Sequence, residues 1–302
     1  MGNRVKPLYL PKFWRSILHV LLYFGVEFAL VIPLVLFAAV LAGINPSLGA
    51  NVDETIMRFL SNSLTNGILS VVIITLFALL IKIRYSLEVK TLYSRRYLSA
   101  GVLITTIITT LGASVLLSEV DNIMRTVIPN WDLMGSGITE MFDNSPLWQN
   151  LLGAVVIAPL TEEFLVRGLW LRGYTRHYKP WVGLVISSVI FGILHMNLPQ
   201  FVGATLCGLL LGWAYLKTNS LLLPMLIHAV HNSISTLGGY LPPIPGFSAV
   251  SASGYQPLWF DILGLILFTG GIYLLNRLLN AERKKIFQPR ADDLVEEVQT
   301  TG

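Results

Sequence analysis

The sequence predicts an all-α fold, a polytopic transmembrane helical bundle of about eight spans with both termini cytoplasmic. Apolar residues make up 54% of the 302 residues and charged residues only 13%, whereas a soluble domain carries about 25% charge. The mean hydropathy is +0.66. A spanning helix needs ~20 mostly apolar residues, and runs close to that length recur along the chain. The composition is typical of a multi-pass protein of the cell membrane, with the lipid bilayer as its surroundings.

Eight apolar runs account for the predicted spans. They are residues 16–43, 66–81, 98–118, 150–170, 181–197, 200–216, 220–238 and 257–279. The first is expected to tilt or to break near Pro33. Its 28 residues are too many for the apolar core of a signal peptide, so we expect an uncleaved anchor. The second, fifth and sixth are short, so their ends are poorly defined by hydropathy.

The distribution of basic residues supports this number of spans. With the N-terminus inside, the predicted inner segments hold 17 Lys and Arg residues and the outer segments hold 2. Cytoplasmic loops of membrane proteins carry such an excess, and an odd number of spans would place one terminal basic cluster outside. The net charge of +4 therefore marks inner loops, and no nucleic-acid partner is expected. A single cysteine, Cys207, allows no internal disulfide.

The chain divides into three predicted parts. Residues 1–149 hold three spans and a long acidic outer segment. Residues 150–238 hold four spans and most of the ionisable residues that lie inside spans. Residues 239–302 hold a Pro-, Gly- and Ser-rich outer loop, the last span and a charged tail. The glycines at 203, 208 and 212 are expected to allow close approach of helices.

Charged residues inside the fourth span point to function. Each costs roughly 2.5–3.5 kcal/mol to insert, yet "APLTEEFLVRGLW" (158–170) holds Glu162, Glu163 and Arg167. Glu163 and Arg167 are four apart and can pair on one helix face. Glu162 points about 100° away from this face. A carboxyl group that is buried without its own cation is suited to act as a general base. A purely structural ion pair, and a Glu162–histidine contact that only ties helices together, remain alternatives.

Imidazole and amide groups follow in later spans. His228 and Asn232 share a face of the seventh span, and His195 ends the fifth. Such groups can donate hydrogen bonds to an oxyanion, so a glutamate beside them is a plausible water-activating site. His231 is more often an interhelical hydrogen-bonding residue. Two Glu and two His could instead bind zinc, although the sequence has no HExxH. It has no GxSG either, which disfavours a serine protease. A proton-coupled transporter and a non-catalytic binding protein are the alternatives from other classes.

Three motifs in order resemble one known family. "EEFLVR" (162–167) fits EExxxR, "FGILH" (191–195) fits FxxxH and "HAVHN" (228–232) fits HxxxN. Together they resemble the CPBP family of intramembrane endopeptidases, which includes type II CAAX prenyl endopeptidases, bacteriocin-processing or immunity proteins (Abi) and proteins similar to lysostaphin-resistance A. The matching region is about 150–238.

The resemblance implies a role for each motif position. Glu162 would activate the attacking water and His195 would assist it. His228 and Asn232 would stabilise the oxyanion, and Glu163 and Arg167 would support the site. The family implies a glutamate-dependent hydrolase of peptide bonds without a cofactor. It also implies a peptide or membrane-protein substrate, with roles in peptide or bacteriocin processing or in immunity.

The depths of the motif residues disagree in this prediction. Counted inward at ~1.5 Å per residue, Glu162 lies ~14 Å from the inner loop that is predicted to begin at 171. By the same measure His195 lies ~21 Å from Trp181. A common site requires the fifth span to tilt or to begin later than predicted.

Overall fold

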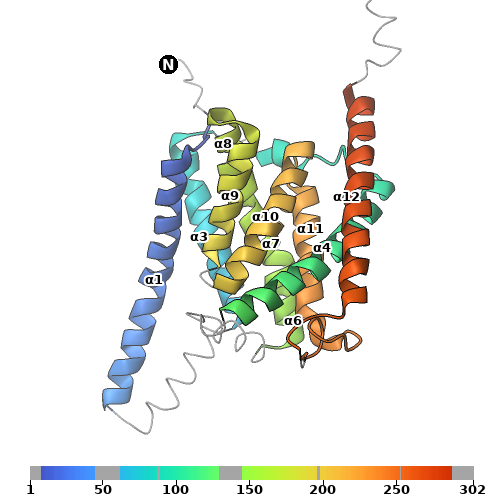
Figure 1. The fold of residues 1–302 in the computed structure, drawn as a ribbon. Coiled ribbons are helices and arrows are strands. Elements are labelled where there is room, and N and C mark those ends of the chain that lie inside the picture. Colours follow the sequence, from blue (N-terminus) through green and yellow to red (C-terminus); the bar gives the residue numbers. More distant parts are fainter. Residues whose placement is uncertain are drawn as a thin grey trace, which may run out of the picture.

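The protein folds as a bundle of helices (Figure 1). The computed structural model describes residues 8–44, 62–86, 89–128, 145–195, 198–251 and 253–287. Within these ranges the regular structure is helical, and the two β-bridges, Leu8–Ser86 and Pro245–Ala249, are isolated. The predicted all-α class is confirmed for this part of the chain.

Helices α1 (Phe13–Ile44) and α3 (Ser63–Arg84) correspond to the first two predicted spans. α1 lies at one edge of the bundle (Figure 1) and continues through Pro33 without a break. The backbone N–H of Tyr9 donates to Ser86 O at 3.1 Å, which ties the start of α1 to the end of α3. The N-cap of α3 is Asn62, whose Oδ1 accepts from the N–H of Leu64 and Thr65, as capping residues do.

The fourth predicted span is one continuous helical rod from Leu147 to His177. It comprises α6 (Leu147–Asn150), the π-helix η2 (Leu151–Ile157), α7 (Ala158–Glu163), the π-helix η3 (Phe164–Leu171) and α8 (Arg172–His177). The rod therefore extends beyond the predicted end at 170. Apolarity falls at Arg172 and Arg176, but the helix continues, because basic residues are favourable in the last turn of a helix.

This extension removes the disagreement in depth. α8 ends at His177, and α9 (Pro180–Leu194) begins after the turn formed by Tyr178 and Lys179. Glu162 precedes the end of the rod by fifteen residues, and His195 follows the start of α9 by fifteen. At ~1.5 Å per residue, both lie ~22 Å along their helices from the same turn. The predicted need for a shifted or tilted fifth span came from ending the fourth span too early.

The remaining helices complete the bundle. They are α4 (Ala100–Val127), α10 (Leu198–Thr218), α11 (Leu222–Thr236) and α12 (Leu258–Phe287), with the 3₁₀ turns η1 (Val89–Tyr93) and η4 (Gly238–Tyr240). α4 and α12 pack at a close crossing, where a Cβ added to Gly112 would lie 2.7 Å from Gly264 O. α4 ends at Val127 and not near 118, so Asp121 and Arg125 lie in its last turns.

The glycines of α10 contribute differently to packing. A Cβ at Gly208 would lie 3.1 Å from Ser188, and one at Gly212 would strike Leu184, so both allow α9 and α10 to approach closely. A Cβ at Gly203 meets nothing within 4 Å. The prediction of close helix approach is therefore confirmed at 208 and 212 and wrong at 203, where the glycine lines a cavity.

The length and apolarity of the helices indicate a membrane protein. Four helices of the described part are long and apolar enough to cross a bilayer: Leu64–Ile83, Ala100–Val127, Gln200–Thr218 and Leu258–Ile286. Phe13–Val26 and Pro180–Leu194 are shorter apolar helices. Large apolar side chains, such as Leu36, Leu80 and Ile266, point away from the bundle. A soluble protein rarely exposes large apolar surfaces of this kind.

Candidate active site

The rod from Leu147 to His177 holds two adjacent carboxylates in different surroundings. Glu163 is fully buried, and its Oε1 accepts from Arg167 Nη1 at 2.8 Å; both side chains have 0% exposure. The predicted pairing of Glu163 and Arg167 is confirmed. Glu162 has 36% of its side chain exposed and lines a cavity. One carboxylate is thus held inside the protein while its neighbour is accessible.

The Glu163–Arg167 pair connects three further helices. Arg167 Nη2 donates to Gly208 O of α10 at 3.1 Å, and its Cζ lies 4.5 Å from the centre of the Phe191 ring of α9. Glu163 Oε1 also accepts from Nδ1–H of His228 on α11 at 2.9 Å. Buried charges require partners of this kind, because an unpaired one is very costly. The pair therefore fixes α9, α10 and α11 around the rod.

Both motif histidines are oriented through Nδ1. His195 Nδ1 lies 2.9 Å from Phe191 O. Because a carbonyl oxygen only accepts, Nδ1 carries the hydrogen, and in neutral His195 Nε2 holds the free lone pair. His228 is held in the same way by Glu163, and its Nε2 lies 3.9 Å from Glu162 Oε2. The arrangement leaves the Nε2 atoms available for chemistry.

Asn232 is anchored to the rod at an irregular turn. Its Nδ2 donates to Ala154 O at 2.7 Å. In this π-helical turn the N–H of Ala158 bonds to Gly153 O, and Pro159 has no N–H to give to Ala154 O. The Asn232 amide therefore satisfies a carbonyl that the helix leaves free. One amide hydrogen is used in this contact, and the second is not.

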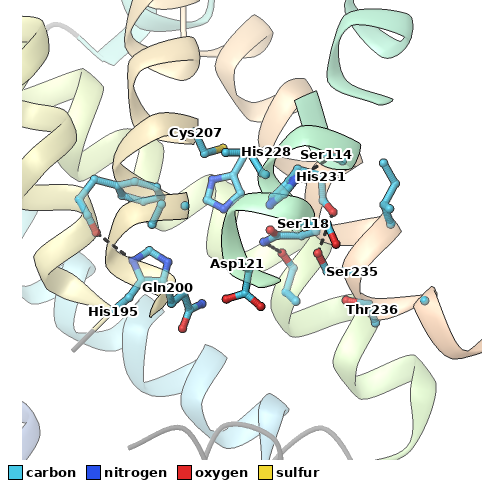
Figure 2. Close-up of a pocket in the computed structure, with 18 of the residues that line it drawn as sticks. Ser114, Ser118, Asp121, His195, Gln200, Cys207, His228, His231, Ser235 and Thr236 are labelled. Carbon is cyan, nitrogen blue, oxygen red and sulfur yellow. Dashed lines mark hydrogen bonds between the residues drawn. The ribbon is translucent and has the colours of Figure 1, made fainter. Parts of the chain in front are cut away.

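The four residues predicted to be catalytic line one cavity of about 410 Å³: Glu162, His195, His228 and Asn232. Figure 2 shows His195, His228 and His231 around this space, with Asp121 of α4 at its side. His231 Nδ1 lies 2.8 Å from Ser114 Oγ. The predicted interhelical hydrogen bond of His231 is confirmed, and its ring also lines the cavity.

The zinc-dependent alternative would use Glu162, Glu163, His195 and His228. Within the described ranges, no three His, Cys, Asp or Glu side chains converge as metal ligands do. Glu163 is already engaged by Arg167 and His228.

The motif region also matches a known family. Residues 144–234 match the family described as Type II CAAX prenyl endopeptidase Rce1-like. This region is therefore similar to the CAAX protease family. The matched family is one of proteases, which are hydrolases.

A curated relative matches part of the chain. An Escherichia coli protein named "Uncharacterized 24.3 kDa protein" is 34% identical over 94 residues, which is 30% of this chain and 43% of the relative. The chain thus spans less than half the length of the curated relative that it matches. No solved structure matches the chain.

Several cavity residues were assigned no role from the sequence. Phe191 stands in the FxxxH motif, and its ring contacts the rings of His195 and His228 edge-on, with centroids 5.0 and 5.8 Å away. Its apolar character gave no signal of a site. Asp121 and Arg125 line the cavity as an ion pair of 2.7 Å. Their spacing of four residues was the available signal, but they fell in a predicted loop.

Proposed function

We propose that the cavity is the active site of an intramembrane endopeptidase in which Glu162 activates a water molecule to attack a peptide bond. The observation that carries the proposal is the contrast between the two glutamates. Glu163 is sealed in an ion pair, while Glu162 is accessible beside His195, His228 and Asn232 in one cavity. General-base catalysis needs an accessible base within reach of its water.

The residues of the cavity suit the steps of hydrolysis. Glu162, assisted by the Nε2 lone pair of His195, takes a proton from the water as its oxygen attacks the carbonyl carbon. His228, when protonated at Nε2, and the second amide hydrogen of Asn232 donate to the resulting oxyanion. The carbon–nitrogen bond then breaks, and the proton held by Glu162 passes to the leaving amine. Buried Glu163 holds His228 in the orientation that this step needs.

The substrate is proposed to be a peptide or a segment of a membrane protein. Because the cavity lies within a helical bundle, it suits a substrate chain that is itself located at the membrane. Peptide or bacteriocin processing, and immunity, are the roles that we propose for this activity, with the protein as a multi-pass component of the cell membrane. The apolar helices, whose large side chains point away from the bundle, support this placement.

The experiment uses purified protein in detergent and a library of short peptides, with and without a metal chelator. We expect cleavage that the chelator leaves unchanged. Cleavage that is lost to the chelator and restored by zinc would favour the zinc-dependent alternative.

A non-catalytic binding or immunity protein is tested in cells. If the function is catalytic, the Glu162→Gln variant, expressed and folded as wild type, loses it. Full cellular function of Glu162→Gln would show that the cavity binds and does not cleave.

A further inference from the structure

Two acidic side chains meet where α4 packs against α12. The helices run antiparallel, and their close contacts at two glycines are Thr109 against Gly271 and Val115 against Gly264. One turn further along this contact, α4 carries Glu119 and α12 carries Asp261. The two carboxylates are close enough to repel each other. Like charges at short distance are unfavourable unless a positive charge or a proton lies between them.

Neither carboxylate has a basic partner. Among the described residues, no Lys, Arg or His forms an ion pair with Glu119 or Asp261. Glu119 Oε2 accepts from the backbone N–H of Gln256 at 3.0 Å and from Asn122 Nδ2 at 2.8 Å. Both donors are neutral. The two negative charges are therefore left without compensation by this part of the chain.

Two buried oxygen atoms at the same place also lack partners. Gln256 is 7% exposed, and its Nε2 donates to Val115 O at 3.2 Å. Its Oε1 is buried and accepts no hydrogen bond from any described residue, and the same holds for Asp261 Oδ1. An acidic residue in the first turn of a helix is favourable, but this does not explain a buried oxygen. Because buried polar atoms nearly always have a partner, both oxygens need a donor or a cation.

We propose that the oxygens of Glu119, Gln256 and Asp261 bind one divalent cation, Ca²⁺, at this end of the bundle. Carboxylate and amide oxygens are the ligands that Ca²⁺ takes, and water molecules complete its shell of 6–8 oxygens. Two carboxylates match the charge of one such ion. The predicted orientation places this end outside the cytoplasm, the side on which weak calcium sites of extracellular modules operate.

A cation bound here joins three segments of the chain. Glu119 lies on α4, Asp261 lies on α12, and Gln256 lies in the segment that connects η4 to α12. The same segment is held to α4 by Asn122, whose Nδ2 also donates to Gly246 O at 2.8 Å. None of the three proposed ligands lines the catalytic cavity. We therefore expect the cation to stabilise the fold and to take no part in hydrolysis.

The test is thermal unfolding of the purified protein in detergent. The protein is first treated with a chelator, the chelator is removed, and Ca²⁺ is added up to about 10 mM. With a Kd on the order of 10⁻⁴–10⁻³ M, typical of extracellular calcium modules, the unfolding midpoint should rise by about 3 °C or more. NaCl of the same ionic strength should not raise it. An equal rise in NaCl, or no rise with Ca²⁺, would overturn the site and indicate a shared proton or a water molecule.

Variants identify the ligands. Glu119→Gln and Asp261→Asn each remove one charge, and Gln256→Leu removes the amide oxygen. Each should weaken Ca²⁺ binding at least about tenfold, a loss that even the outer-shell partners of a metal cause. Asp121→Asn is the matched control, because Asp121 lies on the same helix but pairs with Arg125. A loss of the same size in Asp121→Asn would show that Ca²⁺ responds to overall charge and would contradict the site.

A measurement on the wild type serves where a variant does not fold. Tb³⁺ takes the same oxygen ligands as Ca²⁺, and its emission can be excited through a nearby aromatic ring. Trp259 is two residues from Asp261 in α12, so bound Tb³⁺ should emit on excitation of tryptophan, and Ca²⁺ should reduce this emission by competition. Trp259→Phe should emit much less. Wild-type protein without such emission would overturn the site, and none of these readouts depends on cleavage.

Discussion

At the scale of single residues, two neighbouring glutamates have separate surroundings. The spacing of Glu163 and Arg167 was enough to predict their pairing, because residues four apart on a helix are neighbours. The additional hydrogen bond from His228 to Glu163 was not predictable in this way, since it joins two helices far apart in the sequence. The accessibility of Glu162 depends likewise on how α9 and α11 are placed.

The buried ion pair is expected to be important for stability. Removing one partner of a buried pair costs about 3–5 kcal/mol, because the other charge is left without compensation. Arg167→Met should therefore strongly lower the free energy of unfolding, measured by denaturant titration in mild detergent.

Asp121 and Arg125 provide the matched control. They form a second Arg–carboxylate pair with the same spacing, but their side chains are 35% and 60% exposed. Arg125→Met should cost less than about 1 kcal/mol. Equal losses of unfolding free energy in the two variants would show that burial of the Glu163 pair contributes nothing to stability.

At the scale of elements, the rod from Leu147 to His177 determines the geometry of the site. Hydropathy predicted the existence of this helix but not its length or its π-helical turns, because neither follows from apolarity. π-Helical turns are frequent at functional sites. Here two of them, η2 and η3, flank the short α-helical segment that carries Glu162 and Glu163. An inserted residue in a helix rotates every side chain that follows it.

Substitution of Pro159 tests whether this irregular turn positions Glu162. Pro159→Ala supplies an N–H that can compete with Asn232 for the free carbonyl of Ala154. We expect the hydrogen bond that anchors Asn232 to weaken and Glu162 to be displaced. A displacement of about 1 Å can lower the cleavage rate on the order of 100-fold, so the rate should fall with little loss of thermal stability.

Pro180→Ala is the control for this substitution. Pro180 begins α9, where proline is tolerated because the first N–H groups of a helix lack partners. Its replacement should leave cleavage unchanged. A Pro159→Ala enzyme that is as active as wild type would contradict the positioning role of the turn.

At the scale of the whole molecule, composition was sufficient to predict a helical membrane protein. Eight helical rods in the described part overlap the eight predicted spans. The number of membrane crossings and the orientation stay predictions, because hydropathy and length single out four helices. The start of α1 and the end of α12 lie on the same side of the bundle (Figure 1), as both termini in the cytoplasm require.

Labelling of single cysteines tests this orientation. In a Cys207→Ser background, a thiol reagent that does not cross membranes is added to intact cells. Val250→Cys, in the predicted outer loop and 99% exposed, should be labelled. Lys12→Cys and Lys285→Cys, both at exposed positions, should be labelled only after the membrane is made permeable. Labelling of just one of these two in intact cells would indicate an odd number of spans.

Glu162 is proposed as the base that activates water, and the cleavage rate of Glu162→Gln relative to wild type tests this role. Glu282→Gln is the control, because Glu282 pairs with Lys285 at 3.3 Å and does not line the cavity. Loss of a general base lowers a rate by about 10²- to 10⁴-fold. We expect a loss of this size for Glu162→Gln in a folded protein, and an unchanged rate for Glu282→Gln. A Glu162→Gln protein that cleaves the same peptides at the wild-type rate would contradict it.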